Sequence, residues 1–97
     1  MDEQTRRPWS VTELNEAVRD LLENTFLPVR VAGEISGLTV HSSGHVYLTL
    51  KDEKSQMRAI FFNGAAKCRA LGLENGSQVE ATGKISFYAP RGECQLT

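Results

Sequence analysis

Long apolar runs, paired cysteines and catalytic motifs are all missing from this sequence of 97 residues. No run of apolar residues approaches the roughly 20 that a membrane helix needs. The first ten residues mix charges of both signs and lack the apolar stretch of a signal peptide. We therefore expect a cytoplasmic protein without a membrane partner. The length allows one compact domain and is too short for a binding domain together with a catalytic domain.

Cysteine is scarce. Cys68 and Cys94 are 26 residues apart and belong to no Cys-x-x-Cys pair. This spacing supports neither a zinc site nor a disulfide framework. We expect two free thiols.

Enzymatic signatures are absent as well. The sequence contains no glycine-rich phosphate loop, no H-E-x-x-H, no G-x-S-x-G and no carboxylate cluster with metal-binding spacing. His41 and His45 have a spacing that would align two ligands on a helix, but we expect them to flank a turn. We therefore expect no catalytic residue, no metal site and no cofactor in this chain.

The formal net charge of −1 is unevenly distributed. Residues 1–27 hold six acids against three bases, a balance of −3, whereas residues 28–97 hold eight bases against six acids, a balance of +2. A weakly basic region beside an acidic helix can still bind phosphate locally. Such binding would be weak.

A helix is predicted at the N-terminal end. Ser10 and Glu13 have the spacing of a capping box, and apolar residues then recur at helical intervals over residues 11–24. We assign residues 1–27 to an N-terminal extension with this helix. The remainder, residues 28–97, forms a second unit.

The second unit shows the alternating pattern of β-strands. We expect strands over residues 29–36, 45–51 and 56–62, a short helix over residues 65–71 capped by Asn63, one long fourth strand through residues 79–87, and a fifth strand that begins at residue 93 and is cut off. This order is typical of a mainly β, five-stranded Greek-key barrel of the oligonucleotide-binding (OB) type. A barrel truncated in its last strand can form a homodimer by strand exchange.

Small barrels of this type hold a single nucleic-acid strand across strands two and three, between the loops joining strands one to two and four to five. Aromatic rings stack on bases, and cations follow the phosphates. Three candidates have alternatives: Phe62 in the core, Tyr47 at the barrel rim, and Lys84 as a solvated charge. The residues that match this pattern are His41, His45, Tyr47, Lys51, Arg58, Phe62, Lys84, Tyr88 and Arg91.

Several sequence blocks also resemble a known family. They include Val31-Ala-Gly-Glu-Ile-Ser36, Ser43-Gly-His-Val-Tyr-Leu-Thr-Leu-Lys-Asp52 and Tyr88-Ala-Pro-Arg-Gly-Glu-Cys-Gln-Leu96. Together they resemble the N-terminal domain of exodeoxyribonuclease VII large subunits. The resemblance implies an OB barrel that presents single-stranded DNA to a nuclease domain outside this fragment. It also implies a small-subunit partner that binds through the part of the chain missing here.

Two other functions fit parts of the pattern. Gly-x-Ile near the first strand and Leu-x-Asp at the end of the second also occur in the anticodon-binding barrel of class II aminoacyl-tRNA synthetases. The low net charge is compatible with a module for dimerisation or protein contact. Pro90-Arg-Gly92 before Gln95-Leu96, together with the Thr12-Glu-Leu-Asn15 segment, favours the nuclease family.

Overall fold

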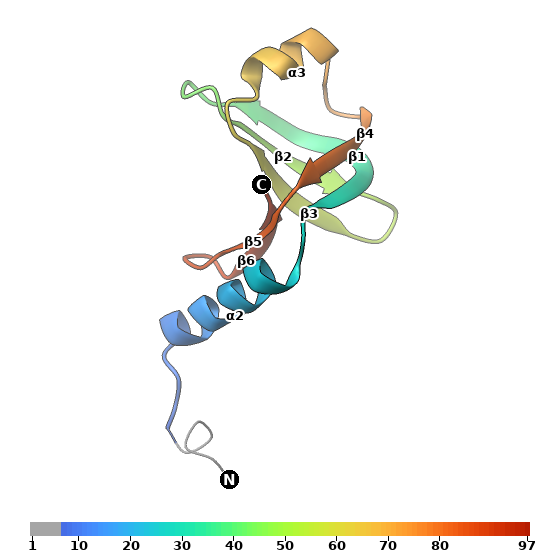
Figure 1. Cartoon of the computed structure of the whole chain (residues 1–97). Helices are drawn as coiled ribbons and strands as arrows, with labels where there is room; N and C mark the ends of the chain where they lie inside the picture. Colours follow the sequence, from blue (N-terminus) through green and yellow to red (C-terminus); the bar gives the residue numbers. More distant parts are fainter. Residues whose placement is uncertain (1–6) are drawn as a thin grey trace.

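The computed structural model describes residues 7–97, so the first six residues of the predicted extension lie outside the described part. Residues 7–97 form two helices and six strands (Figure 1). In chain order these are α2 (Val11–Thr25), β1 (Val29–Val40), β2 (Val46–Lys51), β3 (Gln56–Phe61), α3 (Ala65–Leu71), β4 (Gln78–Gly83), β5 (Ile85–Tyr88) and β6 (Glu93–Leu96).

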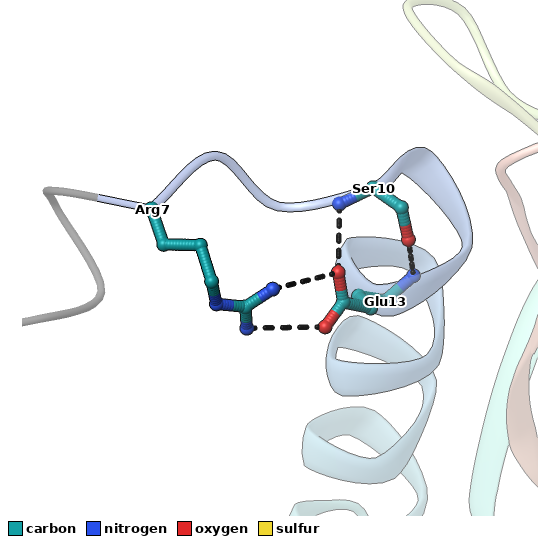
Figure 2. Close-up of polar contacts among 3 residues, drawn as sticks. All are labelled: Arg7, Ser10 and Glu13. Atoms are coloured by element: carbon teal, nitrogen blue, oxygen red, sulfur yellow. Dashed lines mark hydrogen bonds and ion pairs between the residues drawn. The ribbon is translucent and has the colours of Figure 1, made fainter.

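Helix α2 begins at the predicted capping box, which Figure 2 shows. The Glu13 N–H donates to Ser10 Oγ at 3.0 Å, and the Ser10 N–H donates to Glu13 Oε1 at 2.9 Å. Arg7 adds an ion pair to the same carboxylate at 3.2 Å. The hydrogen bond from the Ser10 backbone and the neighbouring Arg7 both lower the pKa of Glu13. The helix start predicted from the sequence is therefore confirmed.

The strands form one sheet in the order β4-β1-β2-β3-β6-β5. All neighbours are antiparallel except β3 and β6, which are parallel. Because β4 and β5 follow each other in the chain but lie at opposite ends of this order, the sheet curls round to form the predicted Greek-key barrel.

The single long fourth strand expected from the sequence is two strands in the structure. β4 pairs with β1 as far as Gly83, opposite Val29, whereas β5 pairs with β6 from Ile85, opposite Leu96. The chain therefore changes its pairing partner at Lys84. A bulky residue would not fit at Gly83, since a Cβ there would collide with the carbonyl oxygen of Thr97.

The core lies inside this barrel. Ile35, Leu50, Ala59 and Leu96 form a buried cluster, one residue from each of four strands. Ala59 shows that Met57, Ala59 and Phe61 form the inner face of β3, a choice that the sequence left open. Of the two thiols, Cys68 is buried and Cys94 is exposed, and both are free.

The short helix α3 confirms the predicted range of residues 65–71, but not its predicted cap. Gly64 is the N-cap, and no side chain caps the helix. A side chain at Gly64 would strike the ring of Phe61, so the tight approach requires glycine. Asn63 instead has a φ of 55° and makes the turn into the helix.

Helix α2 contacts the barrel mainly at β5. The Asn15 side-chain amide donates to the Ala89 carbonyl at 2.8 Å. None of its residues is fully buried, and Val11 and Leu21 are 78% and 67% exposed. In residues 7–97, no helix is both long enough and apolar enough to cross a membrane.

Candidate nucleic-acid interface

The outer faces of β2 and β3 present a continuous surface. Side chains alternate along a strand, so residues next to core positions point outward. Tyr47 lies opposite Ile60, and Thr49 lies opposite Arg58. Arg58 in turn neighbours Gln95 of β6. This surface, defined by Tyr47, Thr49, Arg58, Ile60 and Gln95, is called the outer face below.

The β1–β2 loop brings an aromatic pair to one end of the outer face. The rings of His41 and Tyr47 have centroids 4.4 Å apart and are tilted by 48°. The turn between them is tight, because the His41 N–H donates to the His45 carbonyl at 2.9 Å. Gly44 permits it with a φ of 89°, a value that side chains disfavour. Tyr47 is half-buried, and the His41 ring lies against it.

A second aromatic pair adjoins the first. The rings of His45 and Phe62 meet edge to face at 5.2 Å. His45 Nδ1 accepts a hydrogen bond from the Asn63 N–H at 3.0 Å, which orients the imidazole. Phe62 is 53% exposed, so it does not lie in the core. His45 is therefore held in place by Asn63, with its ring against Phe62.

The β5–β6 loop carries a cation and an aromatic ring that contact each other. Arg91 Cζ lies 5.2 Å from the centroid of the Tyr88 ring. The loop is closed by hydrogen bonds from the Arg91 N–H to the Tyr88 carbonyl and from the Gly92 N–H to the Ala89 carbonyl. Stacked arginine and tyrosine present both a charge and a π-face to a ligand.

Two of the other predicted cations form ion pairs with acidic side chains. Arg58 Nε lies 3.6 Å from Glu93 Oε2, and Lys51 Nζ lies 3.5 Å from Glu34 Oε2. Lys51 sits at the end of β2 farther from the β1–β2 loop. Lys84 is exposed at the β4–β5 junction, outside both aromatic pairs. Arg58 is therefore the predicted cation on the outer face itself.

Sequence reasoning missed four residues of this region. Glu93 forms an ion pair with Arg58, and Gln95 continues the outer face and donates to Ser86 Oγ at 3.4 Å. Ile60 lies opposite Tyr47 on β3. The Asn63 N–H donates to His45. The alternation in β6 carried a usable signal for two of them. With Leu96 in the core, Glu93 and Gln95 must lie on the opposite face.

No three histidine, cysteine, aspartate or glutamate side chains gather into a possible metal site in the stretch from residue 7 to residue 97. The outer face carries the aromatic ring of Tyr47 and the guanidinium group of Arg58.

Comparisons with known proteins agree with this geometry. Residues 9–97 match the family described as OB-fold nucleic acid binding domain. The chain is 46% identical over 90 residues to the exodeoxyribonuclease 7 large subunit of Helicobacter hepaticus, covering 93% of this chain and 22% of that protein. It is 48% identical over 88 residues to the one from Neisseria meningitidis serogroup A, covering 91% of this chain and 20% of that protein. The chain thus spans about a fifth of the length of these relatives.

A solved structure is similar as well. The S. pombe Stn1-Ten1 complex contains a chain that matches with a TM-score of 0.56 and 25% sequence identity, covering 71% of this chain and 52% of that one. The predicted OB fold and the resemblance noted in the sequence are both confirmed.

Proposed function

Because the chain belongs to the family of OB-fold nucleic acid binding domains, we propose that its outer face binds single-stranded DNA. The observation that carries the proposal is a row of aromatic and cationic side chains across the barrel. Tyr47 lies on β2 beside Arg58 of β3, Arg58 pairs with Glu93 of β6, and Glu93 lies opposite Tyr88, whose ring Arg91 contacts. Base stacking on rings combined with backbone contacts to cations is the usual chemistry of single-strand binding.

The strand would cross β2 and β3, as in other barrels of this class. Tyr47 and Phe62 would stack bases near the β1–β2 loop, and Tyr88 would stack a base near the β5–β6 loop. Arg58 and Arg91 would contact phosphates. Affinity should be micromolar or weaker, because Glu93 competes for Arg58 and the net charge is −1.

In a longer polypeptide, the domain would present DNA to a nuclease domain that lies outside these 97 residues. The parent enzyme would be a cytoplasmic exodeoxyribonuclease that binds a small subunit through other parts of its chain. The names of the relatives, each an exodeoxyribonuclease 7 large subunit, support this proposal. The catalytic residues would belong to the missing domain, and this chain would bind without cutting.

The decisive experiment measures fluorescence anisotropy of a labelled, mixed-sequence DNA strand between about 50 and 200 mM salt, because phosphate contacts make affinity salt-dependent. Arg58→Gln should weaken binding and reduce the slope of log K against log salt by about 0.7, the value for one phosphate on a single strand. Glu93→Gln should have the opposite effect, since it frees Arg58.

Arg30→Gln is the matched control. Arg30 is also an exposed arginine in an ion pair, with Glu80 at 3.3 Å, but it lies on β1 beside β4. Its replacement should leave the slope unchanged. Absence of binding at about 50 mM salt and high protein concentration would contradict the proposal. An equal effect of Arg30→Gln and Arg58→Gln would show that the outer face is not the site.

The synthetase alternative predicts a preference for RNA. The same anisotropy experiment with an RNA strand of identical sequence separates the two, because only RNA offers a 2′-hydroxyl to recognise. Equal or tighter binding of DNA favours the nuclease family.

A further inference from the structure

One hydrogen bond joins the β1–β2 loop to the turn between β3 and α3 through a side chain that can change its charge. The Asn63 N–H donates to Nδ1 of the His45 imidazole at 3.0 Å. An imidazole nitrogen accepts a hydrogen bond only while it carries no proton, and both ring nitrogens are donors in the imidazolium ion. This contact therefore requires neutral His45.

The turn that this bond holds has an unfavourable backbone conformation. Asn63 has a φ of 55°, in the left-handed region that residues other than glycine seldom adopt. Its neighbour Gly64 lies so close to the Phe61 ring that a side chain would not fit there. Phe62, which directly precedes Asn63, is exposed and touches the His45 ring edge to face. The bond to His45 therefore stabilises the backbone turn that carries the Phe62 ring.

A second hydrogen bond between the same two segments does not depend on protonation. The Ala65 N–H donates to the Gly44 carbonyl at 3.1 Å, and both groups belong to the backbone. This bond keeps the start of α3 against the β1–β2 loop when the imidazole gains a proton. Protonation should therefore alter the turn at Asn63 locally and leave the barrel folded.

The segments around His45 offer no carboxylate to pair with its protonated form. Residues 35–51, which include the β1–β2 loop, and residues 54–73, which include β3 and α3, contain no aspartate or glutamate. None of the ion pairs among residues 7–97 involves a histidine. Histidine is the side chain that ordinarily changes its charge between about pH 5 and 8. The other charged or titratable groups of these segments are His41, Tyr47, Lys51, Lys54, Arg58, Lys67, Cys68 and Arg69.

We propose that His45 is a positioning residue for DNA binding: in its neutral form it holds Phe62 in place for base stacking, and its protonation releases that ring. This role rests on the proposed function, in which Phe62 is a stacking residue. The expected direction is opposite to that of simple electrostatics. A histidine that gains a positive charge near DNA ordinarily strengthens binding to phosphate, whereas protonation of His45 removes the contribution of one stacked base.

The experiment compares the unmodified protein with Phe62→Ala, using anisotropy of a labelled DNA strand at constant salt. At about pH 8, Phe62→Ala should lower the affinity about five-fold or more, as expected for the loss of one stacked base. At about pH 5, the loss should shrink to about two-fold or less, because a ring that is not held in place stacks poorly. The charge that His41 gains in acid is common to both proteins and cancels in this ratio.

Substitutions at the two histidines separate the hydrogen bond from the charge. His45→Asn keeps an acceptor oxygen near the position of Nδ1 and does not ionise, so the Phe62 contribution should be large at both pH values. His45→Ala lacks the acceptor, and the contribution should be small at both. His41→Asn is the matched control, because it removes the other histidine of the loop and should leave the pH dependence unchanged.

Hydrogen exchange without DNA tests the bond itself. Protection of the Asn63 amide, relative to that of Ala65, should fall between about pH 8 and 5 and should stay constant in His45→Asn. Constant protection in the unmodified protein would overturn the proposal. A Phe62 contribution that is equal at both pH values would do so too, and would show that the ring contact alone positions Phe62. Absence of DNA binding at both pH values, together with a pH-dependent Asn63 amide, would instead overturn the proposed function and with it the role of His45 in binding.

Discussion

Tyr47 contacts side chains on two sides. The His41 ring supports it on one side, and Ile60 lies opposite it on β3. An aromatic ring held in this way loses little conformational freedom when a base stacks on it. Tyr47 is half-buried, and the His41 ring restrains its orientation.

Replacing Tyr47 by alanine should weaken binding of single-stranded DNA by about 1–3 kcal/mol, the usual contribution of one stacked base. Tyr47→Phe should retain most of the affinity, because the ring remains. Anisotropy titrations measure both variants, and thermal melting serves as the control. If the melting temperature of Tyr47→Ala falls while its affinity stays the same, Tyr47 supports the barrel rim and does not stack a base.

The alternating pattern identified the outward position of Tyr47, which follows from the spacing of core residues on β2. On β3 the sequence left the core face open, and the burial of Ala59 places Arg58 on the outer side. The ion pair between Arg58 and Glu93 depends on how β3 lies against β6, a register between distant segments that no local pattern encodes. The hydrogen bond from Asn63 to His45 was unpredictable for the same reason.

Among the elements, α2 was the most predictable, because its capping box and helical period are both local signals. The β4–β5 break was not, because it arises where the strand exchanges β1 for β6 as its partner. Similarly, Asn63 is a common cap residue in isolation. The close contact between Gly64 and Phe61 moves the cap by one residue.

Helix α2 should lose helicity in acid through Glu13. The pKa of this carboxyl is lowered from 4.5 by the Ser10 N–H and by Arg7. A lowered pKa in the folded state means that the stabilisation is present above 4.5 and is lost as the pH falls through the lowered value. A pH titration by far-ultraviolet circular dichroism should therefore show partial helix loss below pH 4.5.

Glu13→Gln is the control for this titration, since glutamine also completes a capping box but does not ionise. The variant should keep its helicity near neutral pH and lose the acid step. Asp52 has a lowered pKa too, from the N–H groups of Lys54 and Ser55, but it lies in the β2–β3 turn and not in a helix. If Glu13→Gln still loses helical signal below pH 4.5, a group other than Glu13 causes that loss.

At the scale of the whole molecule, α2 and the barrel divide the charge between them. The acidic helix lies against β5, near the base of the β5–β6 loop (Figure 1). The barrel depends on the parallel pairing of β3 with β6. It could be predicted from the sequence, because the order of helices and strands is typical of a known topology. The position of α2 did not follow, because its contact with β5 and the hydrogen bond from Asn15 to Ala89 join segments that are far apart in the sequence.

The contact between α2 and the barrel links the helix to DNA binding. Asn15 donates to the Ala89 carbonyl at the start of the loop that holds Tyr88 and Arg91, 74 residues away in the chain. Asn15→Ala removes this bond, whose contribution is about 0.5–1.5 kcal/mol. The loop should then become more mobile, and affinity for single-stranded DNA should fall about two- to ten-fold, although Asn15 lies outside the proposed site.

Leu21→Ser is the matched control for Asn15→Ala, because it alters the same helix at a side chain that is 67% exposed. Its affinity for DNA should equal that of the unmodified chain. Hydrogen exchange at the Arg91 and Gly92 amides, which donate within the loop, reports the mobility directly and should increase only in Asn15→Ala. Faster exchange with unchanged affinity would show that the β5–β6 loop does not contact DNA, and would confine the binding site to Tyr47, Arg58 and the β1–β2 loop.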